Sequence, residues 1–194
     1  MADRATTSRQ ILCLKLIAQK VSKFDVDRVL VLGSSGSGKS TFAQQLGKKL
    51  NIEVIHLDSH YWQPDWTDTP DEEWKQKISQ LLEKESWIMD GNYTSTLAQR
   101  LEYADTVIFL DLNRVKCLWR CVDRYLKYRG ENRPELAAGC NEKIDKDFLK
   151  WIWNYPRDVK PRIMELLGNH PERQVIMLRG SKGINEFLAK MDAT

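Results

Sequence analysis

The stretch VLGSSGSGKSTFAQQL, residues 31–46, joins an apolar run to a segment with helical periodicity. The run at residues 28–32 has the composition of a buried strand, and residues from Thr41 onward begin a helix with one apolar side. Between them, the spacing matches the pattern G-x-x-x-x-G-K-[ST] at every fixed position, which are Gly33, Gly38, Lys39 and Ser40. Strand, glycine-rich loop and helix in this order indicate an α/β protein with a phosphate-binding loop (P-loop).

The chemistry of this loop follows from its residue types. Glycines let the backbone wrap so that its N–H groups point at phosphate oxygens, and the helix N-terminus adds a positive dipole end. We expect Lys39 to reach the β- and γ-phosphates of ATP and the Ser40 hydroxyl to ligate Mg²⁺. A flexible linker is the alternative, but a linker does not require Lys-Ser at this spacing. The expected nucleotide contacts in the loop are Gly33, Ser34, Ser35, Gly36, Ser37, Gly38, Lys39, Ser40 and Thr41.

Length and composition limit the class of protein. With 194 residues, 42% of them hydrophobic, the chain predicts one globular domain. We assign this domain to residues 27–194 and treat residues 1–26 as an N-terminal extension without an assigned function. The four cysteines form no C-x-x-C pair, which argues against zinc. Because no apolar run approaches the length that spans a membrane, we expect a soluble, cytoplasmic protein without a membrane partner.

Four further apolar runs predict strands, at residues 53–57, 87–90, 106–111 and 172–178. Segments with helical spacing separate them, and this alternation predicts a parallel sheet between two layers of helices. One of these helices, beginning near Asp147, is expected to stop at Pro156. In such sheets, ligands bind beyond the carboxyl ends of the strands. The carboxylates at those ends are Asp58, Asp90 and Asp111.

Asp90 and Asp111 compete for the role of protein carboxylate at the magnesium ion. Each ends an apolar strand, where a carboxylate can hold Mg²⁺ directly or through water. We favour Asp90 because Gly91 permits close approach of the backbone to a ligand. Either residue could instead cap the helix that follows it.

The stretch HLDSHYWQPDW, residues 56–66, combines a carboxylate with several aromatic residues. One interpretation is an acceptor pocket, in which Asp58 is the general base for a hydroxyl group and aromatic rings form the walls. The other is a turn in which Asp58 caps the backbone and the rings pack in the core. The residue types support both interpretations equally.

The expected helix at 113–128 has an apolar stripe and a basic stripe. Seven basic and two acidic residues lie between Arg114 and Arg133, so the positive charge of the chain is local. Charges on a helix usually mark a solvated face, but Arg129 and Arg133 continue into a stretch rich in helix breakers. We therefore expect a lid at about 114–147 that clamps polyphosphate. Its basic residues expected to contact ATP are Arg120, Arg124, Arg129 and Arg133.

Contact with nucleic acid is a second interpretation of the basic stripe. Its charges would bind phosphodiesters, and the aromatic residues Trp119, Tyr125 and Tyr128 lie between them, as in proteins that stack single-stranded bases. We favour a local clamp for one polyphosphate, because the charge is clustered and the rest of the chain is slightly acidic.

Residues from about 28 to 180 resemble the DNA topology modulation proteins, which are bacterial P-loop proteins similar to adenylate kinase. The resemblance rests on GSSGSGKSTFA, IHLDSHYWQPDW, DGNY, ADTVIFLDL, RYLKYRGENRPELAAGC and WIWNYP, in this order. It implies the nucleoside-monophosphate-kinase-like P-loop NTPase fold, with five parallel strands in the order 2-3-1-4-5 and a helical lid.

Single motifs imply roles for single residues. DG after the third strand resembles the adenylate kinase motif, which supports Asp90. DSHY is similar to the uridine kinase stretch whose Asp takes the acceptor proton, which supports Asp58. ENRPEL resembles the shikimate kinase lid, which supports Arg129 and Arg133. The zinc cysteines and the DGFPR motif of adenylate kinases are absent, so the resemblance does not extend to AMP as acceptor.

Together these observations predict a kinase that transfers the γ-phosphoryl group of Mg·ATP to a small molecule, such as a nucleoside, another hydroxyl compound or a nucleotide. The expected catalytic residues are Lys39, Asp58, Arg129 and Arg133, and the expected magnesium ligands are Ser40 and Asp90. The alternative is a nucleotide-dependent regulatory or DNA-associated protein without kinase activity. The sequence leaves open the acceptor, the choice of ATP over GTP, and whether the protein is a monomer or a homodimer.

Overall fold

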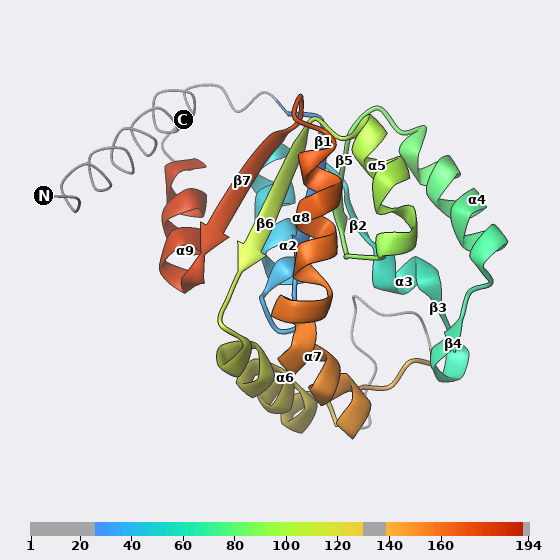
Figure 1. Ribbon diagram of the computed structural model, residues 1–194, viewed down its shortest axis with the longest axis vertical. Helices are drawn as coiled ribbons and strands as arrows, with labels where there is room; N and C mark the ends of the chain where they lie inside the picture. The colour runs from blue at the N-terminus through green and yellow to red at the C-terminus, as the bar shows by residue number, and fades with distance from the viewer. Residues whose placement is uncertain (1–25, 130–138, 192–194) are drawn as a thin grey trace, which may run out of the picture.

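The computed structural model describes residues 26–129 and 139–191, and its centre is a five-stranded sheet (Figure 1). The strands are β1 (Arg28–Gly33), β2 (Val54–His56), β5 (Trp87–Asp90), β6 (Thr106–Asp111) and β7 (Gln174–Arg179). Neighbouring strands are parallel and lie in the order β2-β5-β1-β6-β7. Counted along the chain, these five strands have the order 2-3-1-4-5, so the predicted α/β fold and sheet order are confirmed.

Helices cover both faces of the sheet and form the outer layers. On one face lie α2 (Lys39–Leu50) and α9 (Gly180–Met191). On the other face lie α4 (Asp71–Leu82), α5 (Leu97–Tyr103) and α8 (Lys160–Gly168). Two more helices, α6 (Arg114–Tyr128) and α7 (Lys146–Asp158), lie beyond the arrowhead of β6 in Figure 1. The carboxyl edge of the sheet is therefore the edge that α6 and α7 enclose.

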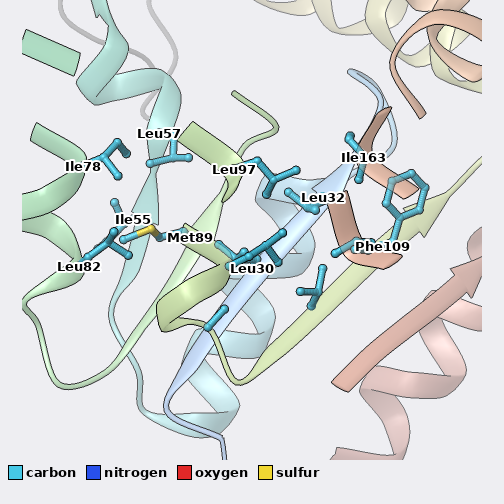
Figure 2. Close-up of a cluster of buried hydrophobic side chains, with 14 of the residues drawn as sticks. Leu30, Leu32, Ile55, Leu57, Ile78, Leu82, Met89, Leu97, Phe109 and Ile163 are labelled. Carbon is cyan, nitrogen blue, oxygen red and sulfur yellow. The ribbon is translucent and has the colours of Figure 1, made fainter. Parts of the chain in front are cut away.

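The central strands β1, β5 and β6 are buried at nearly every position because helices cover both of their faces, whereas the edge strand β7 is mostly exposed. Successive side chains of a strand point to opposite sides of the sheet. Leu30 and Leu32 of β1 therefore face one layer of helices, while Val29 and Val31 face the other. Figure 2 shows the first of these clusters, in which Leu30 and Leu32 lie among side chains from α4, α5 and α8. This packing on two faces provides a rigid support for the loops at the carboxyl edge.

A short excursion follows β2 at that edge. It consists of α3 (Leu57–Tyr61), β3 (Trp62–Gln63), a 3₁₀ turn (Pro64–Trp66) and β4 (Thr67–Asp68), with β3 antiparallel to β4. The predicted end of the second strand, at residue 57, is therefore wrong. The pairing of β2 stops at His56, because its partner β5 ends at Asp90 directly opposite. The chain then turns into a helix, on which Asp58 lies.

The helix expected to stop at Pro156 also differs from the prediction. α7 continues through Pro156 to Asp158, and the separate helix α8 follows it. Pro156 lies in the last turn of α7, where it removes a single backbone hydrogen bond. Ile152 and Tyr155 of the same helix are buried, and we attribute the continuation of α7 to their packing.

The described ranges contain no helix that is both long and apolar enough to cross a membrane. Residues 1–25 of the expected N-terminal extension lie outside the described residues. The same holds for residues 130–138 of the expected lid, including Arg133. The rest of the expected lid consists of α6 and the segment that leads into α7.

Candidate nucleotide and acceptor site

The loop between β1 and α2 ends at an open helix N-terminus. Among the described residues, no side chain caps α2 at Gly38, and its first turn contains no acidic residue. The first N–H groups of a helix lack partners within the helix and carry the positive end of its dipole. The backbone at Lys39, Ser40 and Thr41 therefore forms an anion site.

Two glycines of this loop adopt backbone positions that exclude a side chain. Gly33 has φ of +145° and Gly36 has φ of +74°. A Cβ on Gly33 would lie 2.7 Å from the carbonyl oxygen of Leu110, and a Cβ on Gly36 would lie 2.2 Å from the carbonyl oxygen of Cys117. The loop thus packs directly on β6 and α6.

Two cations lie against the loop. The Lys39 ammonium donates to the carbonyl oxygen of Ser34 at 3.2 Å, and the Arg120 guanidinium donates to that of Ser37 at 3.3 Å. Arg120 also donates to the Ser181 hydroxyl at 3.2 Å, which links α6 to α9. Both cations therefore lie close to the anion site at the start of α2.

Arg124 lies one turn farther along α6 and is paired with a carboxylate. Its Nε donates to Oε1 of Glu142 at 2.9 Å, and the Glu142 side chain is buried. A backbone bridge joins Glu142 to Arg129, whose own side chain is exposed. Arg120 and Arg124 thus lie on the inner side of α6. The catalytic roles of Arg129 and Arg133 stay predictions.

The carboxylate of Asp90 ends β5 and is buried. Its Oδ2 lies 3.0 Å from Nδ1 of His56 on the neighbouring strand. Its Oδ1 has no hydrogen-bond partner among the described residues. Burying a carboxylate oxygen without a hydrogen bond is unfavourable, and binding of a cation or a water molecule to that oxygen would relieve the cost. This free oxygen is compatible with the magnesium role expected for Asp90, which stays a prediction.

Asp111 has the rival position at the end of β6. Its Oδ1 accepts a hydrogen bond from the Lys160 ammonium at 2.8 Å, so this carboxylate is already paired with a cation. The described ranges contain no cluster of three or more His, Cys, Asp or Glu residues that could hold a metal ion. A magnesium ion at Ser40 and Asp90 would therefore need nucleotide phosphates as further ligands. The choice of Asp90 over Asp111 stays a prediction, which the ion pair with Lys160 supports.

Asp58 lies at the start of α3 and is oriented by a tyrosine. The Tyr93 hydroxyl donates to Oδ1 of Asp58 at 2.6 Å, a distance typical of a hydroxyl on a charged carboxylate. Burial raises the pKa of Tyr93, and the charge of Asp58 raises that pKa further, so the proton stays on the phenol. Because the exposed Asp58 carboxylate also lines a cavity, the pocket interpretation of this residue is the better supported one.

A buried arginine that sequence reasoning missed shapes the loop after β5. Arg100 of α5 is fully buried and donates to three successive carbonyl oxygens, those of residues 91–93. Burial lowers the pKa of Arg100 to about 9, so this side chain is still cationic at neutral pH. The Asn92 side chain exchanges two hydrogen bonds, of 3.1 and 2.9 Å, with the backbone of Gly33. These contacts tie the Tyr93 loop to the P-loop.

A cavity of about 1100 Å³ at the carboxyl edge of the sheet brings these groups together. Of the predicted site residues, those that line it are Ser35, Gly36, Ser37, Gly38, Lys39, Ser40, Thr41, Asp58, Arg120 and Arg124. Its aromatic walls include Trp62, Trp66, Tyr93, Phe148 and Trp151. The predicted residues that do not line it are Gly33, Ser34, Asp90 and Arg129. The cavity thus combines a phosphate-binding loop with a carboxylate among aromatic rings.

Comparison with curated proteins shows a sequence similarity over about two thirds of the chain. The relative is the uncharacterized protein YqaC of Bacillus subtilis (strain 168), 28% identical over 127 residues, which are 64% of this chain and 70% of the relative. No protein-family model matches the chain.

Two of the solved structures to which the chain is similar are a shikimate kinase and a gluconokinase. Shikimate kinase from Acinetobacter baumannii in complex with shikimate has a TM-score of 0.53 at 14% identity, covering 86% of this chain and 91% of the other. A gluconokinase from Sinorhizobium meliloti 1021 has a TM-score of 0.49 at 15% identity, covering 86% and 90%. At such identities the likeness to shikimate kinase establishes the fold alone.

Proposed function

We propose that this protein is a kinase that transfers the γ-phosphoryl group of Mg·ATP to a hydroxyl group of a small acceptor. The observation that carries the proposal is the lining of the cavity, where the P-loop with its open helix end shares one space with Asp58 and its aromatic neighbours. The likeness of the fold to shikimate kinase supports this proposal, because that protein is a kinase.

The P-loop binds the phosphoryl donor, ATP. Its backbone N–H groups hold the phosphates, while Lys39 and Arg120 neutralise their charge from two sides. Ser40 and Asp90 would hold the magnesium ion, which supplies further neutralisation of the β- and γ-phosphate oxygens when it is bound. The unpartnered Oδ1 of Asp90 supports this assignment.

Asp58 activates the hydroxyl group of the acceptor. A hydroxyl group is a poor nucleophile until a base accepts its proton, and a positioned carboxylate contributes a factor of about 10²–10⁴ to the rate. The bond from Tyr93 fixes the direction of the Asp58 carboxylate. Trp62 and Trp66 border the same space and suit the apolar faces of a ring-shaped acceptor, such as a nucleoside or a cyclic hydroxyl compound.

Arg129 and Arg133 complete the proposal as lid residues that stabilise the charge of the transferring phosphoryl group. Arg124 would assist Arg129 and Arg133 when the phosphates of a nucleotide displace Glu142 from the Arg124 guanidinium. This part of the proposal rests on the sequence pattern and on the position of Arg124 in the cavity wall.

A DNA-associated protein of the topology modulation type, with the P-loop as a nucleotide switch, is the second candidate. It would need the basic stripe of α6 for phosphodiesters. Two members of that stripe, Arg120 and Arg124, contact the P-loop and Glu142 instead, and this observation favours the kinase. Duplex and single-strand binding measured over a salt series would separate the candidates, since contacts to phosphodiesters weaken steeply with salt.

A screen of ATP consumption over nucleosides, nucleotides, sugars and shikimate-like acids, run with the parent protein and with Asp58→Asn, tests the proposed function. Asparagine retains the shape of the side chain but cannot accept the proton. We expect acceptor-dependent phosphorylation to fall by about 10²–10⁴-fold while the affinity for Mg·ATP is unchanged.

Asp65→Asn provides the matched control. Asp65 is an exposed carboxylate in the turn between β3 and β4, does not line the cavity, and has φ of +61°, which asparagine tolerates well. It should behave like the parent. Equal phosphorylation by the parent and by Asp58→Asn would exclude Asp58 as the base, and a loss confined to the acceptor KM would indicate a phosphate acceptor, which is already ionised.

A further inference from the structure

The outer face of α6 is apolar and exposed to solvent. Its four apolar side chains, which we call the outer stripe, are 40% to 68% exposed: Val115, Trp119, Val122 and Leu126. Cys117 and Cys121 on the opposite side of the helix are buried. This orientation is the reverse of the usual one, in which the apolar stripe of an amphipathic helix faces the core.

Contacts of the inner face hold α6 in this orientation. Gly36 of the P-loop packs on the backbone of Cys117, and Arg120 donates to the loop. Rotating the helix to bury Trp119 would remove both contacts. The outer stripe is therefore a stable feature of the fold, and an exposed patch of this kind usually marks an interaction site.

We propose that the outer stripe is the interface of a twofold-symmetric homodimer, in which α6 packs antiparallel on α6 of a second copy. The four residues follow one another at intervals of four, three and four, which is the spacing of d and a positions in a heptad repeat. Antiparallel pairing would place Trp119 beside Val122 of the second copy, and Val115 beside Leu126. Large and small side chains then alternate along the seam.

The charges beside the stripe match this orientation. Lys116 and Asp123 both fall at the e position, and in an antiparallel pair the e positions of the two helices face each other. Lys116 of each copy would therefore lie opposite Asp123 of the other, which gives two symmetric ion pairs. Asp123 already pairs with Lys127 of its own helix at 2.7 Å, so its carboxylate lies at the helix surface, where a second cation can reach it.

The available area also suits a second copy. The outer stripe exposes on the order of 500 Å² of apolar surface. Trp153 of the adjacent α7 is 44% exposed and has the Arg114 guanidinium 3.9 Å above its ring. It would extend the contact toward the roughly 800 Å² per partner that stable interfaces bury.

The N-terminal residues of the same chain are less suited than a second copy to cover the outer stripe. Residues 1–25 contain five basic and two acidic residues. The flanks of the outer stripe are also mainly basic, because Arg114, Lys116 and Lys127 outnumber Asp123. Like charges would oppose each other in such a contact, whereas a second copy of α6 brings Asp123 to Lys116.

The association state of the full chain, measured by analytical ultracentrifugation over a concentration series, tests the dimer. We expect a dimer for the parent and a dissociation constant raised by at least about 100-fold in Trp119→Glu, because the substitution occurs twice across the twofold axis. Tyr103→Glu on α5 is the matched control: Tyr103 is 44% exposed, lies away from α6, and should leave the dimer intact. Because Trp119 is exposed, the variant should retain the unfolding midpoint that the parent has at concentrations below its dissociation constant, where dimerisation does not stabilise the fold.

Charge reversal tests the orientation. Lys116→Glu and Asp123→Lys should each weaken the dimer several-fold, and the two together should restore it. Failure of the double variant to recover would overturn the antiparallel arrangement. A monomeric parent would overturn the dimer, and single-stranded DNA binding lost in Trp119→Glu would then assign the outer stripe to nucleic acid. None of these outcomes depends on kinase activity.

Discussion

Replacement of Gly36 by alanine tests how closely the P-loop must approach α6. Gly36 has φ of +74°, and an added Cβ would lie 2.2 Å from the carbonyl oxygen of Cys117 and 2.9 Å from Sγ of Cys121. Ordinary contacts of a Cβ begin at 3.4 Å. The loop and the helix would therefore have to separate by roughly 1 Å, and backbone on both sides resists this movement.

Two costs combine in this variant. Alanine in the left-handed region costs about 1–2 kcal/mol relative to glycine, and overpacking at a tight contact costs typically about 1–3 kcal/mol. We expect the free energy of unfolding to fall by about 2–5 kcal/mol. The displaced loop should also weaken Mg·ATP binding by at least about tenfold, because the phosphate-binding N–H groups move with it.

Gly168→Ala is the matched control for this substitution. Gly168 ends α8, and a Cβ there would meet no atom within 4 Å. Alanine should leave stability unchanged or raise it by up to about 1 kcal/mol. Urea denaturation and calorimetric titration with Mg·ATP measure both effects. If Gly36→Ala proved as stable as Gly168→Ala and bound Mg·ATP like the parent, the close packing of loop and helix would be refuted.

Three further substitutions test other parts of the site. Tyr93→Phe removes the hydroxyl that orients Asp58. It should lower kcat by between about tenfold and a hundredfold, measured by initial rates, at unchanged Mg·ATP affinity. A normal kcat would show that Tyr93 does not orient Asp58. Arg129→Ala and Arg133→Ala should each lower kcat by about 10²–10³-fold and weaken nucleotide binding much less; salt-sensitive loss of DNA binding at normal turnover would favour the DNA-associated candidate. Arg100→Met leaves three carbonyl oxygens without their donor and should lower the free energy of unfolding by at least about 2 kcal/mol in urea denaturation; a stable variant would show that water replaces the guanidinium.

Local sequence predicted the parts of the fold that depend on local spacing. The strand, glycine-rich loop and helix at residues 28–50 are present because the pattern of the loop and the apolar periodicity on both sides lie within one short stretch. The order of the sheet followed from the resemblance to a known family. Asp58 lines the same cavity as Lys39, although the strand expected to precede it ends earlier and a helix carries it.

Long-range contacts explain what the sequence could not predict. The two stripes of α6 are visible in the sequence, but the direction in which they face depends on Gly36 and Arg120. A basic inner face and an apolar outer face follow only when the helix is known to pack beside a phosphate-binding loop. The partner of Arg124, Glu142, lies 18 residues later in the sequence, and no periodicity connects them.

The sequence indicates the burial of Arg100 only weakly. Arg100 lies three residues after Leu97 and next to Leu101, so it falls on the apolar side of its helix. Apolar surroundings indicate burial, but they do not identify partners. Those partners are the carbonyl oxygens of residues 91–93, whose directions are set by the backbone of that loop.

Phosphoryl transfer by the full chain and by Lys39→Ala, followed by phosphorus NMR with Mg·ATP and the acceptor panel, tests the proposed kinase most directly. The Lys39 ammonium donates to the carbonyl oxygen of Ser34 and lines the cavity, so we expect its removal to leave the fold intact. We predict that ADP and one new phosphomonoester form with the parent and that neither forms with the variant. A parent that forms no phosphomonoester from any acceptor, or a variant that binds and turns over ATP like the parent, would contradict the assignment of the P-loop to phosphoryl transfer.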